Sequence, residues 1–239
     1  SFYGELSYQL YMMKDWPYMI LTDGNSHNLA LNFQLSRSSI DNPIYTRRGS
    51  QFTIGLKITP PYSLIRGTTD AQYAQMSTTE KYNLLEYHKW RFSGKVFTPL
   101  TADSKLVLMA RADFGYLGHY NKNVKSPFES FYMGGDGMSS YSSYSTEYIS
   151  MRGYQSGSLT PYDPAVGRNM GYVYNKFTME LRYPISLEQN ATIWALAFVE
   201  AGNCFADIKD YNPFKLKRSA GIGVRLFLPM FGLMGIDWG

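Results

Sequence analysis

Hydrophobic and polar side chains alternate with a period of two along much of this chain, and helical periodicity is scarce. Residues 52–58 read Phe-Thr-Ile-Gly-Leu-Lys-Ile, and the same alternation recurs over 177–183 and 222–228. A segment of this kind is a β-strand that carries apolar side chains on one face and small, polar or charged ones on the other. The pattern therefore predicts an all-β fold.

Nine strands are expected, and many are longer than the five or six residues usual in soluble sheets. Their lengths match the roughly 9–11 residues that a tilted strand needs to cross a bilayer. The expected strands span residues 2–13, 27–37, 50–59, 85–98, 104–116, 172–185, 191–205, 216–228 and 232–239.

Long and short connections take turns from the third strand onward. The long ones are 60–84, 117–171 and 206–215, and the short ones are 99–103, 186–190 and 229–231. Antiparallel neighbours place successive connections at opposite ends, so one rim is short and the other elaborate. Outer-membrane barrels have this asymmetry. We therefore predict an antiparallel transmembrane β-barrel, with a soluble sandwich or lipocalin-like barrel as the alternative.

The two faces and the strand ends support a membrane barrel with a wet interior. The polar face carries more charge than a dry core tolerates unless it is hydrated or internally paired. Aromatic side chains near strand ends are expected to form girdles at the membrane interfaces. The polar-face charges are Lys57, Arg111, Asp113, Glu180, Arg182, Glu200 and Arg225, and the expected girdle consists of Tyr11, Trp16, Tyr18, Phe97, Tyr116, Tyr172, Tyr174, Tyr183 and Trp238.

Composition narrows the functional classes. Of 239 residues, 16% are aromatic and 18% charged, and the net charge of +4 includes no dense basic run, which argues against disorder and nucleic-acid binding. The single cysteine, Cys204, is expected to be a small apolar filler. The histidines at 27, 88 and 119 have neither metal-ligand spacing nor a nucleophile context. We expect no catalytic residue, metal or cofactor.

The first ten residues resemble no export signal, so either the protein is not exported or the sequence begins inside a longer one.

The long segment 117–171 contains a candidate site. Arg152 stands between Met151 and a Gly-Tyr pair, where a glycine turn could carry it into a confined interior. Two carboxylates, Glu180 and Glu200, point to the polar face of the next two strands and could share the guanidinium fork. The simpler alternative is a flexible surface loop above solvated wall residues.

Two loop motifs, SPFESFYMGG (126–135) and MRGYQ (151–155), are similar to the F-Y-x-G-G and R-G-F/Y signatures of the BamA/TamA superfamily of outer-membrane assembly factors, in particular its BamA-type barrels. The flanking segments resemble that family in the same order. They are SRSSIDNPIYTRRGSQF (36–52), HKWRFSGKVFTPLTADSKLVLMARADFGYLG (88–118), FTMELRYPI (177–185), FVEAGNCF (198–205) and RSAGIGVRLFLPMFGLMGIDWG (218–239).

The resemblance implies a specific role for the long loop. It is expected to fold into the lumen, where Arg152 pairs with Glu180 and Glu200 on the inner wall. Gly153 would supply the tight turn, and Tyr154 would pack where the family often has Phe. Gly134 and Gly135 would let the loop approach the wall closely. The stretch 136–150 looks like an insertion between the two motifs.

The resemblance also implies that residues 1–239 are the C-terminal portion of a sixteen-stranded barrel, without its closing strand and its periplasmic POTRA domains. The implied function is insertion of β-barrel proteins into the bacterial outer membrane by strand templating at a lateral seam. The implied partners are nascent outer-membrane proteins, POTRA domains of the same chain, accessory lipoproteins, membrane lipid and lipopolysaccharide. The alternatives are a TamA-like factor, a two-partner secretion transporter or a passive porin.

Overall fold

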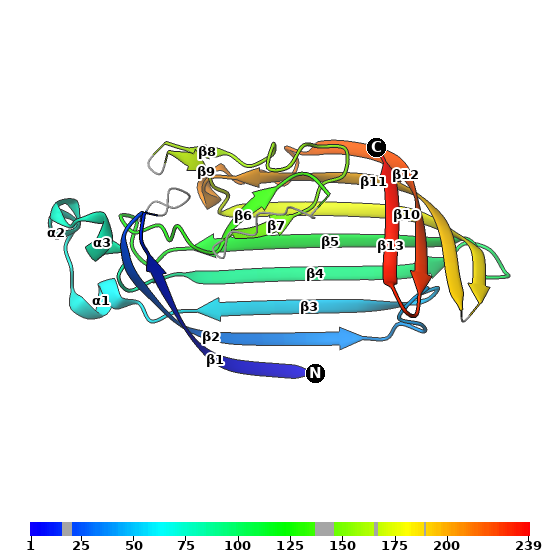
Figure 1. Cartoon of the computed structure of the whole chain (residues 1–239), viewed down its shortest axis with the longest axis horizontal. Helices are drawn as coiled ribbons and strands as arrows, with labels where there is room; N and C mark the ends of the chain where they lie inside the picture. The colour runs from blue at the N-terminus through cyan, green and yellow to red at the C-terminus, as the bar shows by residue number, and fades with distance from the viewer. Residues whose placement is uncertain (16–20, 137–145, 165–166, 189) are drawn as a thin grey trace.

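A computed structural model describes residues 1–15, 21–136, 146–164, 167–188 and 190–239. Its main feature is a nine-stranded antiparallel sheet in the order β1-β2-β3-β4-β5-β10-β11-β12-β13 (Figure 1). The bounds are β1 (Phe2–Met13), β2 (Gly24–Ser38), β3 (Gly49–Ile58), β4 (His88–Pro99), β5 (Val107–Gly118), β10 (Val173–Glu188), β11 (Ala191–Phe205), β12 (Lys217–Leu228) and β13 (Gly232–Trp238).

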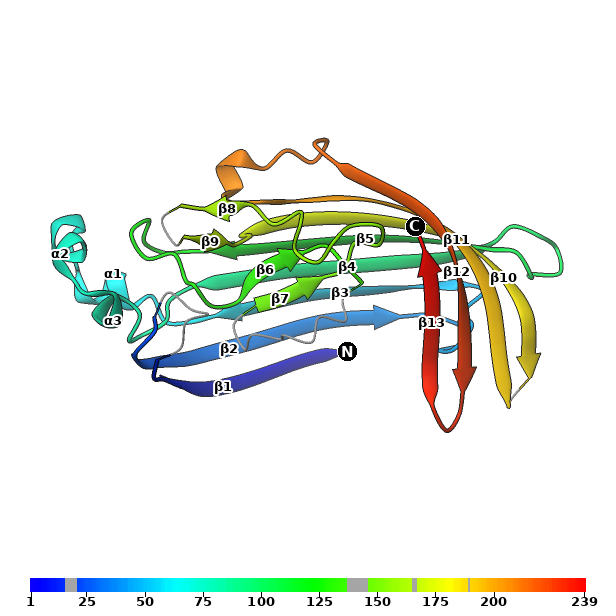
Figure 2. The same ribbon diagram turned by 45° about the horizontal axis from the view of Figure 1, so that its top comes forward.

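All nine expected strands are present, and the all-β prediction is confirmed. The sheet curves into a trough without closing (Figure 2), and within the described chain β1 and β13 each pair on one side only. Three strands start three residues away from expectation. β2 begins at Gly24 rather than at residue 27, and β4 begins at His88 rather than at residue 85. β5 begins at Val107 rather than at residue 104, since Ser104 takes a left-handed φ of 54° in the turn that precedes it.

The expected asymmetry of the rims is also confirmed. The β4–β5, β10–β11 and β12–β13 turns lie at one end of the strands, and the longer connections lie at the other (Figure 2). The β2–β3 connection, 39–48, lies on the short rim and folds inward. There Tyr45 is buried, and its hydroxyl donates a hydrogen bond to the carbonyl oxygen of Lys105 at 3.1 Å.

Segment 60–84 contains three short helices that the alternation did not predict: α1 (Tyr62–Arg66), α2 (Asp70–Gln75) and α3 (Thr78–Lys81). They are too short for a helical period to appear. The capping boxes Thr69/Gln72 and Ser77/Glu80 were readable signals at the starts of α2 and α3. Among the described residues, no helix is long and apolar enough to cross a membrane.

Segment 117–171 is more structured than expected. It forms a parallel pair, β6 (Ser130–Met133) with β7 (Thr146–Ile149), and a small antiparallel pair, β8 (Tyr162–Asp163) with β9 (Arg168–Asn169). The alternation of hydrophobic and polar residues did not predict these four strands. Strands of two to four residues are too short to show a period, and parallel pairing leaves no hairpin signal. A short 3-10 helix, η1 (Ile208–Asp210), lies in the connection 206–215.

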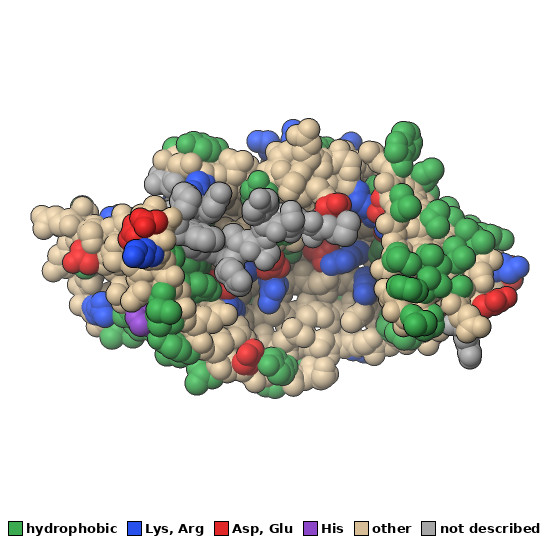
Figure 3. All heavy atoms as spheres, viewed as in Figure 1, with side chains coloured by type: hydrophobic (Ala, Val, Ile, Leu, Met, Phe, Trp, Pro, Cys, Tyr) green, Lys and Arg blue, Asp and Glu red, His purple; other side chains and the backbone are tan. Residues whose placement is uncertain are grey.

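The outer face of the sheet is apolar, as the alternation predicts. Large hydrophobic side chains remain exposed along the strands of the sheet other than β5, and Figure 3 shows apolar side chains gathered over β12 and β13. Such an extended apolar surface is suited to hydrocarbon rather than water. Representative members are Phe52, Ile54, Phe92, Phe177, Met179, Leu181, Val199, Ile222, Val224 and Ile236.

The inner face corrects two expectations. It is not uniformly polar, because two clusters of buried hydrophobic side chains lie inside the trough. Of the expected girdle, Tyr183 and Trp238 are exposed and Tyr116 contacts His88 on the outer face. Four others point inward and pack in or against those clusters, namely Tyr11, Phe97, Tyr172 and Tyr174, while Trp16 and Tyr18 lie outside the described residues.

Candidate functional site

The long loop crosses the concave side of the sheet, where β6 and β7 lie over the strands (Figures 1 and 2). Backbone hydrogen bonds hold it in place. The Phe131 amide donates to the Gly171 carbonyl at 2.8 Å, and the Gly171 amide returns a bond to Phe131 at 3.0 Å. The Leu159 amide donates to the Met133 carbonyl at 3.1 Å. The loop is thus tied to its own return segment just before β10 begins.

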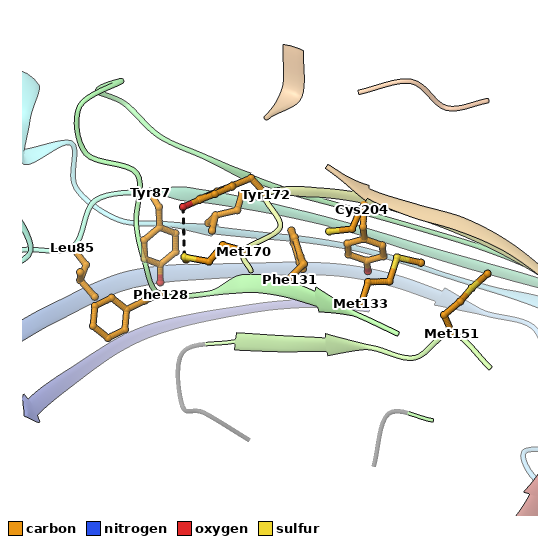
Figure 4. Close-up of a cluster of buried hydrophobic side chains, with 11 residues drawn as sticks. Leu85, Tyr87, Phe128, Phe131, Met133, Met151, Met170, Tyr172 and Cys204 are labelled. Carbon is orange, nitrogen blue, oxygen red and sulfur yellow. Dashed lines mark hydrogen bonds between the residues drawn. The ribbon is translucent and has the colours of Figure 1, made fainter. Parts of the chain in front are cut away.

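Hydrophobic packing fixes the loop against the wall. Phe131, Met133 and Met151 of the loop belong to one buried cluster with Tyr174 and Cys204 of the strands, and Figure 4 shows Phe131 and Met133 beside Cys204. The rings of Phe131 and Tyr174 meet edge to face, with centroids 4.7 Å apart. Each fully buried side chain of this size contributes about 1.5–3 kcal/mol. Cys204 fills this cluster as a small apolar side chain, as expected.

Arg152 is the centre of the polar contacts between loop and wall. Its Nη2 donates to Glu180 Oε1 at 2.9 Å and to Glu200 Oε1 at 2.7 Å. Nε donates to Glu200 Oε1 at 3.0 Å, and the backbone amide donates to Glu200 Oε2 at 2.9 Å. The guanidinium carbon lies 3.7 Å from the centroid of the Phe198 ring. The structure thus brings Arg152 together with both carboxylates that the parity of the strands had turned inward.

The wall supplies further charges at this point. Arg182 was expected on the polar face, whereas Lys176 and Asp237 were not among the residues expected there. Lys176 Nζ lies 3.0 Å from Glu200 Oε1, and Arg182 Nη2 lies 2.8 Å from Glu180 Oε2. Asp237 lies 3.6 Å from Arg152 Nη1. Each of these side chains stands on the inward face of its strand, so strand parity was the signal that could have found Lys176 and Asp237.

Arg152 stays charged in this setting. Burial alone would lower the pKa of its guanidinium, but the hydrogen bonds and charges of Glu200 and Glu180 outweigh that effect and raise the pKa. The glycine after it, Gly153, has a φ of 80°, which carries the chain around the turn. Tyr154 is half-buried, and its hydroxyl donates to the Arg218 carbonyl at 2.9 Å.

Gly134 and Gly135 approach a different part of the chain than expected. Both have left-handed backbones, with φ of 126° and 81°. A Cβ on Gly134 would stand 2.5 Å from the Gln155 carbonyl oxygen, and one on Gly135 would meet Ser156 at 3.0 Å. The close approach is therefore between the two halves of the loop and not between loop and wall. Most of the expected insertion, residues 137–145 of 136–150, lies outside the described residues.

A second group of ion pairs, around Glu129, joins the loop to the opposite part of the wall. The Glu129 carboxylate bridges Lys57 of β3 and Lys89 of β4, the latter at 3.0 Å. Glu147 of β7 lies 2.7 Å from Lys89 and 3.5 Å from Arg91. Here the loop supplies the anions and the wall the cations, the reverse of the arrangement at Arg152. Sequence reasoning missed Glu129 and Glu147, because loop residues have no parity to reveal their direction.

The pKa of Glu129 reflects this setting. Burial disfavours its charged form, but Lys89 and Lys57 more than offset that effect and lower the pKa to about 2.

Comparison with known proteins gives a family and a fold. The model of the Omp85 superfamily domain matches residues 4–239. The sequence has no significant match among curated proteins. Among 62 matching solved chains is BamA from Haemophilus ducreyi lacking POTRA domains 1–3, with a TM-score of 0.61 and 17% identity. That match covers 90% of the present chain and 39% of the BamA chain, so the present chain spans well under half of it.

Replacing Arg152 tests the loop attachment. In Arg152→Ala, Glu200 keeps Lys176 as a partner and Glu180 keeps Arg182. We therefore expect the free energy of loop detachment to fall by about 3 kcal/mol, the lower end for a broken buried ion pair. Chymotrypsin cleavage after Tyr154 should accelerate roughly a hundredfold. The cleavage rate of Arg152→Lys should lie between those of the wild type and Arg152→Ala, because lysine keeps the charge but lacks the guanidinium fork. Exposed Tyr162 serves as the internal reference, and Arg66→Ala is the matched control. Equal cleavage of wild type and Arg152→Ala would contradict the attachment.

The low pKa of Glu129 predicts an acid-sensitive contribution to stability. Because the folded pKa lies below the unfolded value of 4.5, the contribution is complete above pH 4.5 and disappears as the pH falls toward 2. Its size is about 3 kcal/mol. At pH 7 the midpoint of unfolding of Glu129→Gln should lie below that of the wild type. At pH 2 the two midpoints should nearly coincide. Glu188→Gln, at an exposed turn, should change little at either pH. A difference independent of pH would contradict this pairing.

Proposed function

Because the chain belongs to the Omp85 superfamily, whose barrels serve outer-membrane protein biogenesis, we propose that this protein inserts β-barrel proteins into the bacterial outer membrane. The observation that carries the proposal is the loop held inside the trough by Arg152, Glu180 and Glu200. A passive pore needs an open lumen, whereas packed loop residues such as Phe131 and Met133 occupy part of the trough, which supports an insertase over a pore. With the loop in this position, the surfaces left to act on a client protein are the sheet and its edges.

The proposed mechanism is strand addition. A barrel seam that is imperfectly zipped offers unpaired backbone donors and acceptors to an incoming strand, and that strand templates the next one of the client. Burial of client strands in lipid supplies the free energy, so the proposal needs neither a catalytic residue nor a cofactor. In this proposal residues 1–239 form the C-terminal part of the barrel domain, and Arg152, Gly153 and Tyr154 steady the wall behind the seam.

The proposed setting follows from the family. The protein is integral to the outer membrane, with POTRA domains of the same chain on the periplasmic side. Its proposed partners are nascent outer-membrane proteins, accessory lipoproteins, and membrane lipid including lipopolysaccharide. A TamA-like factor or a two-partner secretion transporter is the competing proposal within the superfamily, since both use an Arg-Gly-Phe/Tyr loop. A secretion transporter would move its client across the membrane, whereas an insertase would leave it in the bilayer.

Reconstitution of the full-length protein in liposomes tests the proposed function. An unfolded outer-membrane barrel added to these vesicles should become a folded, heat-modifiable species faster than in empty vesicles. Arg152→Ala should slow this assembly roughly tenfold, which corresponds to about 1.4 kcal/mol. Arg152→Lys should recover part of the rate, and Arg66→Ala should leave it unchanged. Client recovered in the vesicle lumen would favour secretion, and steady porin-like conductance without client folding would overturn the proposal.

A further inference from the structure

The trough encloses a cavity of about 1060 Å³ between the long loop, the β12–β13 hairpin and the inner faces of β4, β5 and β10. Figure 3 shows the molecule hollowed at this place, with basic and acidic side chains gathered on its floor. The turn that contains Tyr45 closes the short-rim end, where Pro43, Ile44 and Thr46 line the cavity. The cavity is therefore a charged compartment that is partly open on the concave side of the sheet.

The charges in this compartment do not balance. Six cationic side chains and four carboxylates line it. Glu180, Glu200 and Asp237 already accept from the cations around Arg152 or from Arg225. The excess cations lie on the other side of the cavity, on β4 and β5.

Lys95 and Arg111 are the cations on that side, and Asp113 of β5 is the carboxylate that Arg111 meets there. They face each other directly across β4 and β5, and like charges in this position repel. Within the described chain Lys95 has no hydrogen bond or ion pair. Arg111 uses its Nε for Asp113 at 2.7 Å, on its own strand, which leaves both terminal amino groups without a carboxylate partner among the described residues. An anion between the two side chains would offset their repulsion.

Arg182 of β10 completes a cationic corner. It lines the same cavity as Lys95 and Arg111. Its Nε and Nη2 hold Glu180, at 2.9 and 2.8 Å, so its Nη1 remains for another acceptor. Three neighbouring strands thus place an ammonium group, a guanidinium fork and one further guanidinium nitrogen in the lining of the same cavity.

We propose that the corner formed by Lys95, Arg111 and Arg182 binds a phosphate-class oxyanion. A dianion with several acceptor oxygens can take bonds from a point charge such as Lys95 and from the planar fork of Arg111 at once. Its charge also offsets the surplus of one cation that remains when Asp113, the partner of Arg111, is counted with the four carboxylates of the lining. The volume leaves room for the remainder of a phosphomonoester. This inference depends only on the geometry of the cavity and is independent of the insertase proposal.

Titration calorimetry on the full-length protein in phosphate-free detergent solution tests the site directly. The two probes are inorganic phosphate and glycerol 3-phosphate, which distinguish a free oxyanion from a phosphomonoester. We expect saturable binding of at least one of them. Lys95→Gln and Arg111→Gln should each weaken it at least tenfold, while Lys122→Gln, which removes a lysine in an external connection, should leave it unchanged. Absence of saturable binding by the wild type, or binding unaltered in both variants, overturns the proposal.

A thermal measurement separates the site from a general structural role for Lys95. In phosphate-free buffer Lys95→Gln removes the repulsion from Arg111, so its unfolding midpoint should lie above that of the wild type. Adding the probe that binds should raise the wild-type midpoint by several degrees and leave that of Lys95→Gln unchanged, which reverses their order. A variant that is less stable than the wild type without phosphate, or that responds equally to phosphate, contradicts the proposal.

Discussion

The ion cluster around Arg152 is the interaction on which the interior of this protein depends. Glu200 is almost fully buried and Glu180 nearly so, and a carboxylate in such a place is tolerated only when it is paired and hydrogen-bonded. Arg152 meets both and approaches Asp237, so one loop side chain joins β10, β11 and β13. The dependence is mutual. The wall carboxylates fix the position of the loop, and Arg152 of the loop neutralises the buried carboxylates of the wall.

The two anchors of the loop have opposite polarity, which sets its orientation. At Arg152 the loop is the cation and the wall the anion, while at Glu129 and Glu147 the loop is anionic and meets Lys57 and Lys89. A loop placed the other way round would bring like charges together at both ends. Between the anchors, the cluster around Phe131 supplies the apolar contact. The loop therefore braces the curved sheet from one side of the trough to the other.

Strand parity made much of this arrangement predictable. The side-chain period of two placed the nine strands and turned Glu180 and Glu200 inward. The same parity, followed further, would have corrected the aromatic girdle, since Phe97 is in phase with Lys95 and Tyr174 with Lys176. The partners from the loop were out of reach. Glu129 takes a left-handed φ of 68°, and neither its direction nor the pairing of β6 with β7 follows from any local period.

Hydrogen exchange of the full-length protein in a lipid nanodisc tests the central claim most directly, namely that the long loop is packed inside the barrel wall. The amides of Phe131, Met133, Met151 and Arg152 should exchange as slowly as those of β10 and β11, because each donates a hydrogen bond inside the trough. The external segment 62–81 provides the comparison for exposed backbone. Loop amides that exchange as fast as that segment would contradict the claim, because a loop held in the lumen by Arg152 and Glu129 could not open so readily.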